Sequence, residues 1–196
     1  SNSMPLFAGL VAPEDKQAVL SNLVKDIEEK GFRLSTGDVG NRYLFQVLAR
    51  NGLNEVMYKM HNHNEVPGYG FQLQYGATTL TELWDPRKGA SWNHFMMGQI
   101  EEWFYRSLAG INVDENAYTG FKRFNIAPQV VGDLTLVNAS YITLYGEVKV
   151  NWKVDNGQFE MDVEVPVNCE AKVFLPNETN YITVKSGKYS FKKKLN

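Results

Sequence analysis

One stretch of the sequence combines residue types that could carry out chemistry on a sugar. Residues 76–86 read GATTLTELWDP and place the carboxylate of Glu82 two residues before the indole of Trp84. An indole packs on the apolar C–H face of a pyranose, and a carboxylate can move protons at the anomeric carbon. Because a charge flanked by leucines is costly to bury unpaired, Glu82 is either paired or functional. The alternative is an acid at a helix start, satisfied by backbone N–H groups.

A tyrosine and a histidine lie on either side of this stretch. Tyr69 belongs to a PGYG turn at residues 67–70, and we expect it to join Trp84 as a stacking platform for a sugar. His94 would be the third residue of a helix opened by Ser91, where the positive end of the dipole keeps an imidazole neutral. It could contact a sugar hydroxyl, or it could simply be satisfied by helix capping. Two weaker candidates for stacking are Tyr75 and Trp92.

Metal, disulfide and cofactor chemistry find little support in the sequence. His61 and His63 form an H-x-H pair, which could bind a metal only on an extended segment, and no acid or cysteine ligand set accompanies them. The one cysteine, Cys169, excludes an internal disulfide and is expected to be a small buried apolar residue. We therefore expect no metal and no cofactor.

Four amphipathic helices are expected to position these residues. The first begins near Pro13 and ends at Gly31, the second covers residues 41–50, the third begins with Asn54 as its cap, and the fourth covers residues 91–108. The residues expected to face inward are Leu20, Leu23, Val24, Ile27, Leu44, Val47, Leu48, Phe95, Met96, Trp103, Phe104 and Leu108. Helices with aromatic-rich inner faces joined by loops are typical of a section of an α/α toroid.

Beyond Ile111 the hydrophobic period changes from 3.6 to 2, which predicts β structure after a linker at residues 112–120. Residues 148–154 and 159–165 alternate around Asp155-Asn156-Gly157, the pattern of a β-hairpin in which Trp152 points inward. Short strands are expected at residues 134–137, 141–145, 171–175, 181–184 and 189–191. Strands at this spacing favour an antiparallel sandwich.

Composition excludes several classes of partner. The net charge of -2 gives no reason to expect nucleic acid or an anionic membrane surface, and the basic run at residues 192–194 is expected to be a solvated strand end. No apolar run approaches the roughly 18 residues that a membrane span needs. The first residues, SNSMPLF, lack the regions of a signal peptide, and residues 1–3 look like a cloning remnant. The compartment is left open.

Four motifs together resemble one known family. They are PGYG, GATTLTELWDP, SWNHFMMGQIEEWFYRSLAGI at residues 91–111, and FKRFNIAPQVVGDLTLVNASY at residues 121–141. They closely resemble the C-terminal part of bacterial α-L-rhamnosidases, glycoside hydrolase family 78, over nearly the whole chain from about Leu6. The resemblance implies a two-domain α+β fold. Residues 1–111 would form about a third of an (α/α)6 barrel, and residues 112–196 an antiparallel β-sandwich.

The resemblance also implies roles for individual residues. The glutamate of the GATT…E.W motif is the family's general base, which corresponds to Glu82, and the histidine of the S.NH motif, His94 here, contacts the sugar. The family commonly has Trp before this glutamate and Arg after it, whereas this chain has Thr81 and Leu83. This departure leaves another deoxyhexose or a uronic acid open as the sugar.

An inverting mechanism is implied, with a general acid roughly 6.5–9.5 Å from the base. The family's acid lies upstream, in a segment absent from these residues. Asp38 and Asp85 are the nearest substitutes, and we expect both to be cap or loop acids instead. The chain alone should therefore be an inactive fragment that needs the missing N-terminal part of the barrel to act on a rhamnose-containing carbohydrate.

The alternative is a module without catalytic activity, for carbohydrate binding or for assembly. A partial toroid leaves apolar helix faces uncovered, and such faces favour self-association.

Overall fold

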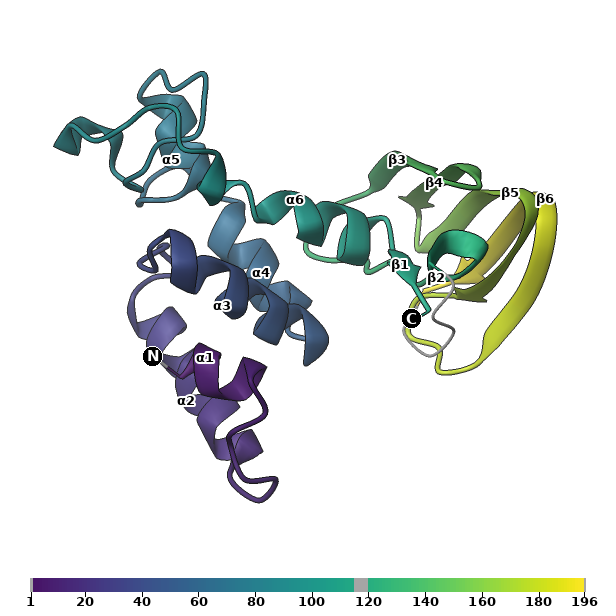
Figure 1. The fold of residues 1–196 in the computed structure, drawn as a ribbon, viewed down its shortest axis with the longest axis horizontal. Helices are drawn as coiled ribbons and strands as arrows, with labels where there is room; N and C mark the ends of the chain where they lie inside the picture. Colours follow the sequence, from purple (N-terminus) through teal and green to yellow (C-terminus); the bar gives the residue numbers. More distant parts are fainter. Residues whose placement is uncertain (1, 115–119, 196) are drawn as a thin grey trace. The chain divides into compact units, whose positions relative to one another are not determined.

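The computed structural model describes residues 2–114 and 120–195 and divides the chain into two units, Ser1–Trp103 and Phe104–Asn196. The first unit is helical, and the second is built on a β-sheet (Figure 1). The expected order of a partial helical toroid followed by a β domain is thereby confirmed. Among the described residues, no helix has both the length and the apolarity that crossing a membrane requires.

Three long helices carry the core of the first unit. After the short α1 (Ser3–Phe7) come α2 (Lys16–Glu29), α3 (Asp38–Arg50) and α4 (Asn54–His61). Their buried apolar residues are Leu20, Leu23, Ile27, Leu44, Val47, Leu48, Met57 and Met60. Gly31 follows α2 with φ +64° and Gly52 follows α3 with φ +73°, so both helices end as predicted. One detail was wrong: Asn54 does not cap α4, because its side chain accepts a hydrogen bond from the indole of Trp103, 2.9 Å away.

A helix that the sequence did not predict begins inside the PGYG motif. It is α5 (Tyr69–Gln74), and its first turn packs very closely against His63. A Cβ atom on Gly70 would lie 2.3 Å from the carbonyl oxygen of His63, so only glycine fits there. The next segment contains 3-10 turns at Pro86–Lys88 and Phe95–Met97 before α6 (Ile100–Trp103) and a π-helical turn at Phe104–Leu108.

The fourth predicted helix was wrong over residues 91–99. The backbone N–H of His94 donates to the carbonyl of Leu80 at 2.9 Å, and the carbonyl of Ser91 accepts from the N–H of Glu82 at 2.9 Å. Because these groups bond to a distant loop, they are not free to form helical bonds. Phe95 and Met96 are consequently exposed instead of inward. Phe104, in the π-helical turn, is also exposed, whereas Trp103 and Leu108 are buried as expected.

The strands of the second unit form one sheet. They are β1 (Ile111–Val113), β2 (Arg123–Ile126), β3 (Leu136–Thr143), β4 (Gly146–Asp155), β5 (Gln158–Phe174) and β6 (Tyr181–Lys194). The order is β1-β2-β5-β4-β3, and β6 pairs with β5. Every pair is antiparallel except β2 with β5, which run parallel. The predicted hairpin is confirmed, since Asp155 lies opposite Gln158 and both turn residues have positive φ.

Strand β5 explains how the sheet curls around its core. Its first half pairs with β4 and its second half with β2, while β6 follows both halves across an irregularity between Val165 and Glu170. The strands bend there without ending, because the ladder of hydrogen bonds to β6 resumes at Glu170. The segments predicted as strands at 134–137 and 141–145 therefore overlap one strand, β3, which covers only residues 136–143 of them. The segments predicted at 181–184 and 189–191 both lie within the single strand β6.

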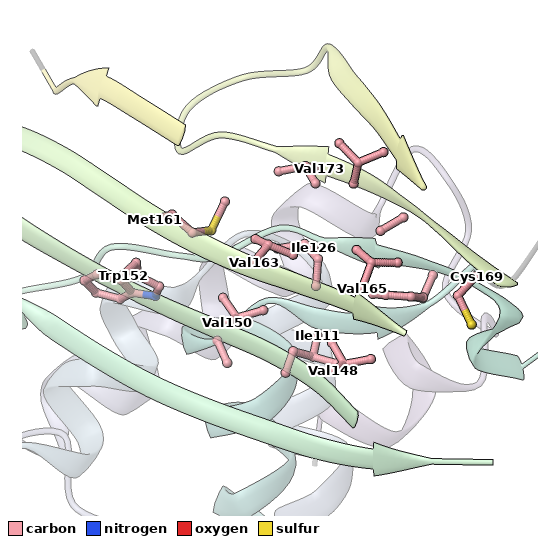
Figure 2. Close-up of a cluster of buried hydrophobic side chains, with 14 of the residues drawn as sticks. Ile111, Ile126, Val148, Val150, Trp152, Met161, Val163, Val165, Cys169 and Val173 are labelled. Carbon is pink, nitrogen blue, oxygen red and sulfur yellow. The ribbon is translucent and has the colours of Figure 1, made fainter. Parts of the chain in front are cut away.

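The core of the second unit lies among β1, β2, β4, β5 and β6 (Figure 2). Trp152 points inward as predicted, and its indole N–H donates to the carbonyl of Leu108 at 2.8 Å. Cys169 is buried, also as predicted, and burial raises the pKa of its thiol. Part of the expected linker is the strand β1, and residues 115–119 of that linker lie outside the described residues.

Candidate active site

Glu82 and His94 lie on the two arms of one closed loop. The arms are joined by the backbone bonds from His94 to Leu80 and from Glu82 to Ser91. The hydroxyl of Thr79 adds a bond to the carbonyl of Trp92. We call residues 79–94 the site loop. Its backbone bonds bring together two motifs that the sequence had only placed next to each other.

The side chain of Glu82 is exposed and forms no ion pair with the described residues. Its Oε2 accepts one hydrogen bond from the backbone N–H of Ser91 at 3.3 Å, and no lysine or arginine among the described residues pairs with it. Glu82 does not begin a helix, because the nearest turn starts at Pro86, so the interpretation as a helix-start acid is wrong. The exposed carboxylate is therefore accessible to solvent.

Trp84 and Tyr69 are packed into the protein. The indole of Trp84 is 8% exposed and its N–H donates to the carbonyl of Thr36 at 2.7 Å. The ring of Tyr69 meets it edge to face with centroids 5.0 Å apart, and the Tyr69 hydroxyl donates to the carbonyl of Met97. Burial raises the pKa of that phenol. Stacking against a sugar stays a prediction for both residues, and Trp92, 43% exposed, is the more open ring on the site loop.

His94 immediately precedes the 3-10 turn at Phe95–Met97 and is not inside a helix. The arguments from helix dipole and helix capping therefore do not apply to it. Its ring is half-buried, and the buried Nε2 atom has no hydrogen-bond partner among the described residues. The carboxylate of Asp38 lies nearby, with 3.6 Å between Nε2 of His94 and Oδ2 of Asp38.

A partly buried polar network joins the start of α3 to Gln99 and, through Thr36, to the site loop. The side-chain amide of Gln99 donates to the carbonyl of Asp38 at 3.0 Å and accepts from Asn41 at 3.0 Å. Asn41 accepts in turn from the hydroxyl of Thr36 at 2.9 Å, and the carbonyl of Thr36 holds the indole of Trp84. Sequence reasoning missed this network, although a polar Asn41 on the buried face of a helix was a signal.

Asp85 is not available as a free acid. Arg87 donates to it twice, from Nε to Oδ1 at 2.8 Å and from Nη2 to Oδ2 at 2.9 Å. The hydrogen bonds from Arg87 hold the pKa of Asp85 below its usual range. Asp85 also accepts from the backbone N–H of Arg87 and so caps the turn at Pro86–Lys88. The expectation that Asp85 is a cap acid is confirmed.

The histidine pair lies beside the PGYG turn. His61 donates from Nδ1 to the carbonyl of Met57 at 2.6 Å, while its Nε2 and both ring nitrogens of His63 are buried without partners among the described residues. Burial lowers the pKa of His61 to about 4. No group of three metal-binding side chains occurs within residues 2–114 and 120–195.

Comparison with known proteins places the chain in a class and then in a family. Residues 1–108 match the model of the bacterial alpha-L-rhamnosidase 6 hairpin glycosidase domain, which defines the class as a six-hairpin glycosidase. Residues 110–190 match the bacterial alpha-L-rhamnosidase C-terminal domain. The chain belongs to the bacterial α-L-rhamnosidase family, and the resemblance seen in the sequence is confirmed.

Individual relatives agree with this assignment. An α-L-rhamnosidase of Streptomyces avermitilis is 32% identical over 88% of this chain and 17% of the relative, and one of Formosa agariphila is 32% identical over 90% and 20%. Among solved structures, the Dictyoglumus thermophilum enzyme has a TM-score of 0.88 at 34% identity over 97% of this chain and 25% of that one. The Streptomyces avermitilis enzyme complexed with L-rhamnose has a TM-score of 0.88 at 29% identity over 98% and 21%. The chain thus spans about a fifth of the length of its curated relatives.

Proposed function

We propose that this chain supplies the general-base half of the active site of an inverting α-L-rhamnosidase. In this proposal residues 1–111 belong to the (α/α)6 barrel and residues 112–196 form the C-terminal β domain. The observation that carries it is the carboxylate of Glu82, which is exposed, is paired with no lysine or arginine of the described residues and is held on a closed loop with His94.

The roles follow from the chemistry of inversion. A general base takes a proton from the water that attacks the anomeric carbon, while a general acid protonates the leaving oxygen from the opposite side. Glu82 is the base. Asp85 is engaged by Arg87 and cannot serve as the acid, so we assign the acid to a segment outside this chain. The much greater length of the relatives supports that assignment.

His94, Trp84 and Tyr69 are proposed to bind the sugar. His94 offers a ring nitrogen that has no partner within the described residues. Trp84 and Tyr69 contribute through the edges that packing leaves open and by fixing the position of the site loop.

The test uses the full-length enzyme that contains these residues and an aryl α-L-rhamnoside. Glu82→Gln should lower kcat by about 10²–10⁴-fold, the range for loss of a general base, with binding of L-rhamnose retained. Glu101→Gln, which removes an exposed acid on α6, should leave kcat unchanged. Proton NMR of the first product should show the β anomer. Wild-type kcat in Glu82→Gln would refute the base, and an α anomer would refute inversion.

The residues 1–196 alone should release no p-nitrophenol from the same substrate, because the acid is missing. Turnover by this piece that disappears on Glu82→Gln would contradict the assignment of the acid to another segment.

A second function, assembly without catalysis, is favoured by exposed apolar side chains on the first unit. Leu10, Leu73 and Phe95 are 79%, 70% and 84% exposed. Such surfaces favour association, either with further barrel segments or with a second copy. Light scattering should show concentration-dependent mass for residues 1–196, and a constant monomer mass would contradict self-association.

A further inference from the structure

We propose that Asp38 is a substrate-binding residue that holds, together with His94, one hydroxyl group of the sugar. This inference rests on the proposed function of the site loop. It goes further because it assigns a sugar hydroxyl to Asp38 and predicts that the part of the sugar next to Asp38 is neutral.

The distance between the two side chains is the first observation. His94 Nε2 and Asp38 Oδ2 are 3.6 Å apart, which is longer than a direct hydrogen bond. At this separation, one hydroxyl oxygen placed to the side of the line between the two atoms can lie about 2.8 Å from both of them, within hydrogen-bonding distance of each. A hydroxyl can accept from the imidazole N–H and donate to the carboxylate at the same time. It would supply the partner that the buried Nε2 atom lacks within the described residues.

The second observation is that Asp38 is held in one orientation. Its Oδ1 accepts from the backbone N–H of Val39 at 2.8 Å, and its carbonyl accepts from the side chain of Gln99 at 3.0 Å. The favourable interaction of an acid with the first turn of α3 explains the charge at this position. It does not explain why Oδ2 faces His94. A carboxylate fixed in this way can bind a hydroxyl without first losing rotamer freedom.

The sign of the charge then restricts the sugar. A carboxylate on the ligand next to Asp38 would be repelled, and like charges placed in contact reduce affinity. Asp38 therefore favours a neutral sugar such as a deoxyhexose and disfavours the uronic acid that the sequence had left open.

The experiment measures KM and kcat of the full-length enzyme with an aryl α-L-rhamnoside, and Kd for L-rhamnose by calorimetry. Asp38→Asn should raise KM and Kd about tenfold, the typical cost of one charged hydrogen bond, and should change kcat less than threefold. Asp26→Asn removes an exposed acid on α2 that pairs with Lys30, and it should match the wild type.

A double-mutant cycle tests whether both residues hold the same group. If they do, Asp38→Asn combined with His94→Ala should raise KM much less than the product of the two single effects. Strictly multiplicative effects would overturn the shared hydroxyl. Should Asp38→Asn lower the melting temperature by more than a few degrees, Asp38→Ser is judged by the same criteria, because serine is well tolerated at a helix start.

The outcomes distinguish the role of Asp38 from the proposed role of Glu82 as the general base. If Glu82→Gln is inactive while Asp38→Asn has wild-type KM and Kd, only the role of Asp38 is overturned. If Glu82→Gln retains full activity, the base assignment fails whatever Asp38 does. A loss of kcat at unchanged KM in Asp38→Asn would also overturn hydroxyl binding.

Discussion

Trp84 shows that a residue of the site motif can also support the fold of the protein. The sequence placed an indole beside a carboxylate, and an open stacking face was the natural expectation. In the structure the indole N–H donates a hydrogen bond to the carbonyl of Thr36, and the residue is only 8% exposed. Sequence spacing gives no information on which carbonyl 48 residues away will accept that N–H. The identities of Glu82 and His94 as site candidates could be predicted, whereas the supports of the site could not.

Trp84→Phe should destabilise the helical unit. The substitution leaves the Thr36 carbonyl without its donor, which costs about 1–3 kcal/mol of the free energy of unfolding. Urea unfolding followed by circular dichroism at 222 nm measures it. Trp92→Phe on the same loop is the matched control, because that indole is 43% exposed, and it should change the midpoint very little. Equal midpoints for the two variants would contradict a structural role for Trp84.

His61 should make the helical unit sensitive to acid. Its pKa falls from 6.5 to about 4 on burial, so the unfolded chain binds the proton more tightly than the folded one. Its contribution to stability is therefore complete above pH 6.5 and is lost as the pH falls from 6.5 towards 4. At about 1.4 kcal/mol per pKa unit, the loss is about 3 kcal/mol at most.

The measurement is the melting temperature of residues 1–196 between pH 7 and pH 4.5. His61→Phe, whose ring can still pack against Phe45, should show a flatter dependence than the wild type over this window. Identical slopes would show that other groups cause the acid sensitivity.

At the scale of elements, hydrophobic periodicity correctly predicted the helices whose formation depends on local sequence. Helices α2, α3 and α4 were expected because their apolar residues recur at helical spacing, and all three are present. Residues 91–99 have a helical pattern too, yet their backbone bonds to residues 80 and 82. Hydrogen bonds to a neighbouring segment of the same loop override the local preference for a helix here. Hydrogen bonds to neighbouring strands likewise joined short predicted strands into β3 and β6.

The PGYG turn should not tolerate a side chain at its second glycine. Gly70→Ala would bring Cβ to 2.3 Å from the carbonyl oxygen of His63, and we expect a loss of about 1–3 kcal/mol in unfolding free energy. Gly40→Ala is the matched control in α3, where the new Cβ meets only Thr36 at 3.7 Å. It should be neutral or stabilising by about 0.5–1 kcal/mol. Urea midpoints compare the two, and a harmless Gly70→Ala would contradict the tight turn.

At the scale of the whole molecule, each of the two units has its own buried apolar residues. The order of helices and strands was readable from the change in hydrophobic period near Ile111. The parallel pairing of β2 with β5 could not be predicted from the sequence, because β2 is only four residues long and its register depends on the second half of β5.

Val150→Asp should unfold the β domain and leave the helical unit folded. Val150 is fully buried, and an unpaired charge there costs about 3 kcal/mol or more. Hydrogen exchange should rise in peptides from residues 146–165 and stay low in peptides from residues 16–50. Ile142→Asp, at a position 81% exposed, should leave both groups protected. Loss of protection in both units after Val150→Asp would show that they fold as one.

The hydrogen bonds that shape the site loop all join residues between Thr36 and Gln99. Because these bonds lie within residues 36–99, we expect the site loop to keep its conformation when the polypeptide is cut outside this range. If the chain alone is inactive and the full-length protein cleaves rhamnosides, as we propose, this piece and the remaining segment could be fused to the two members of an interacting pair. Turnover of a chromogenic rhamnoside would then be expected only when the two members bind each other.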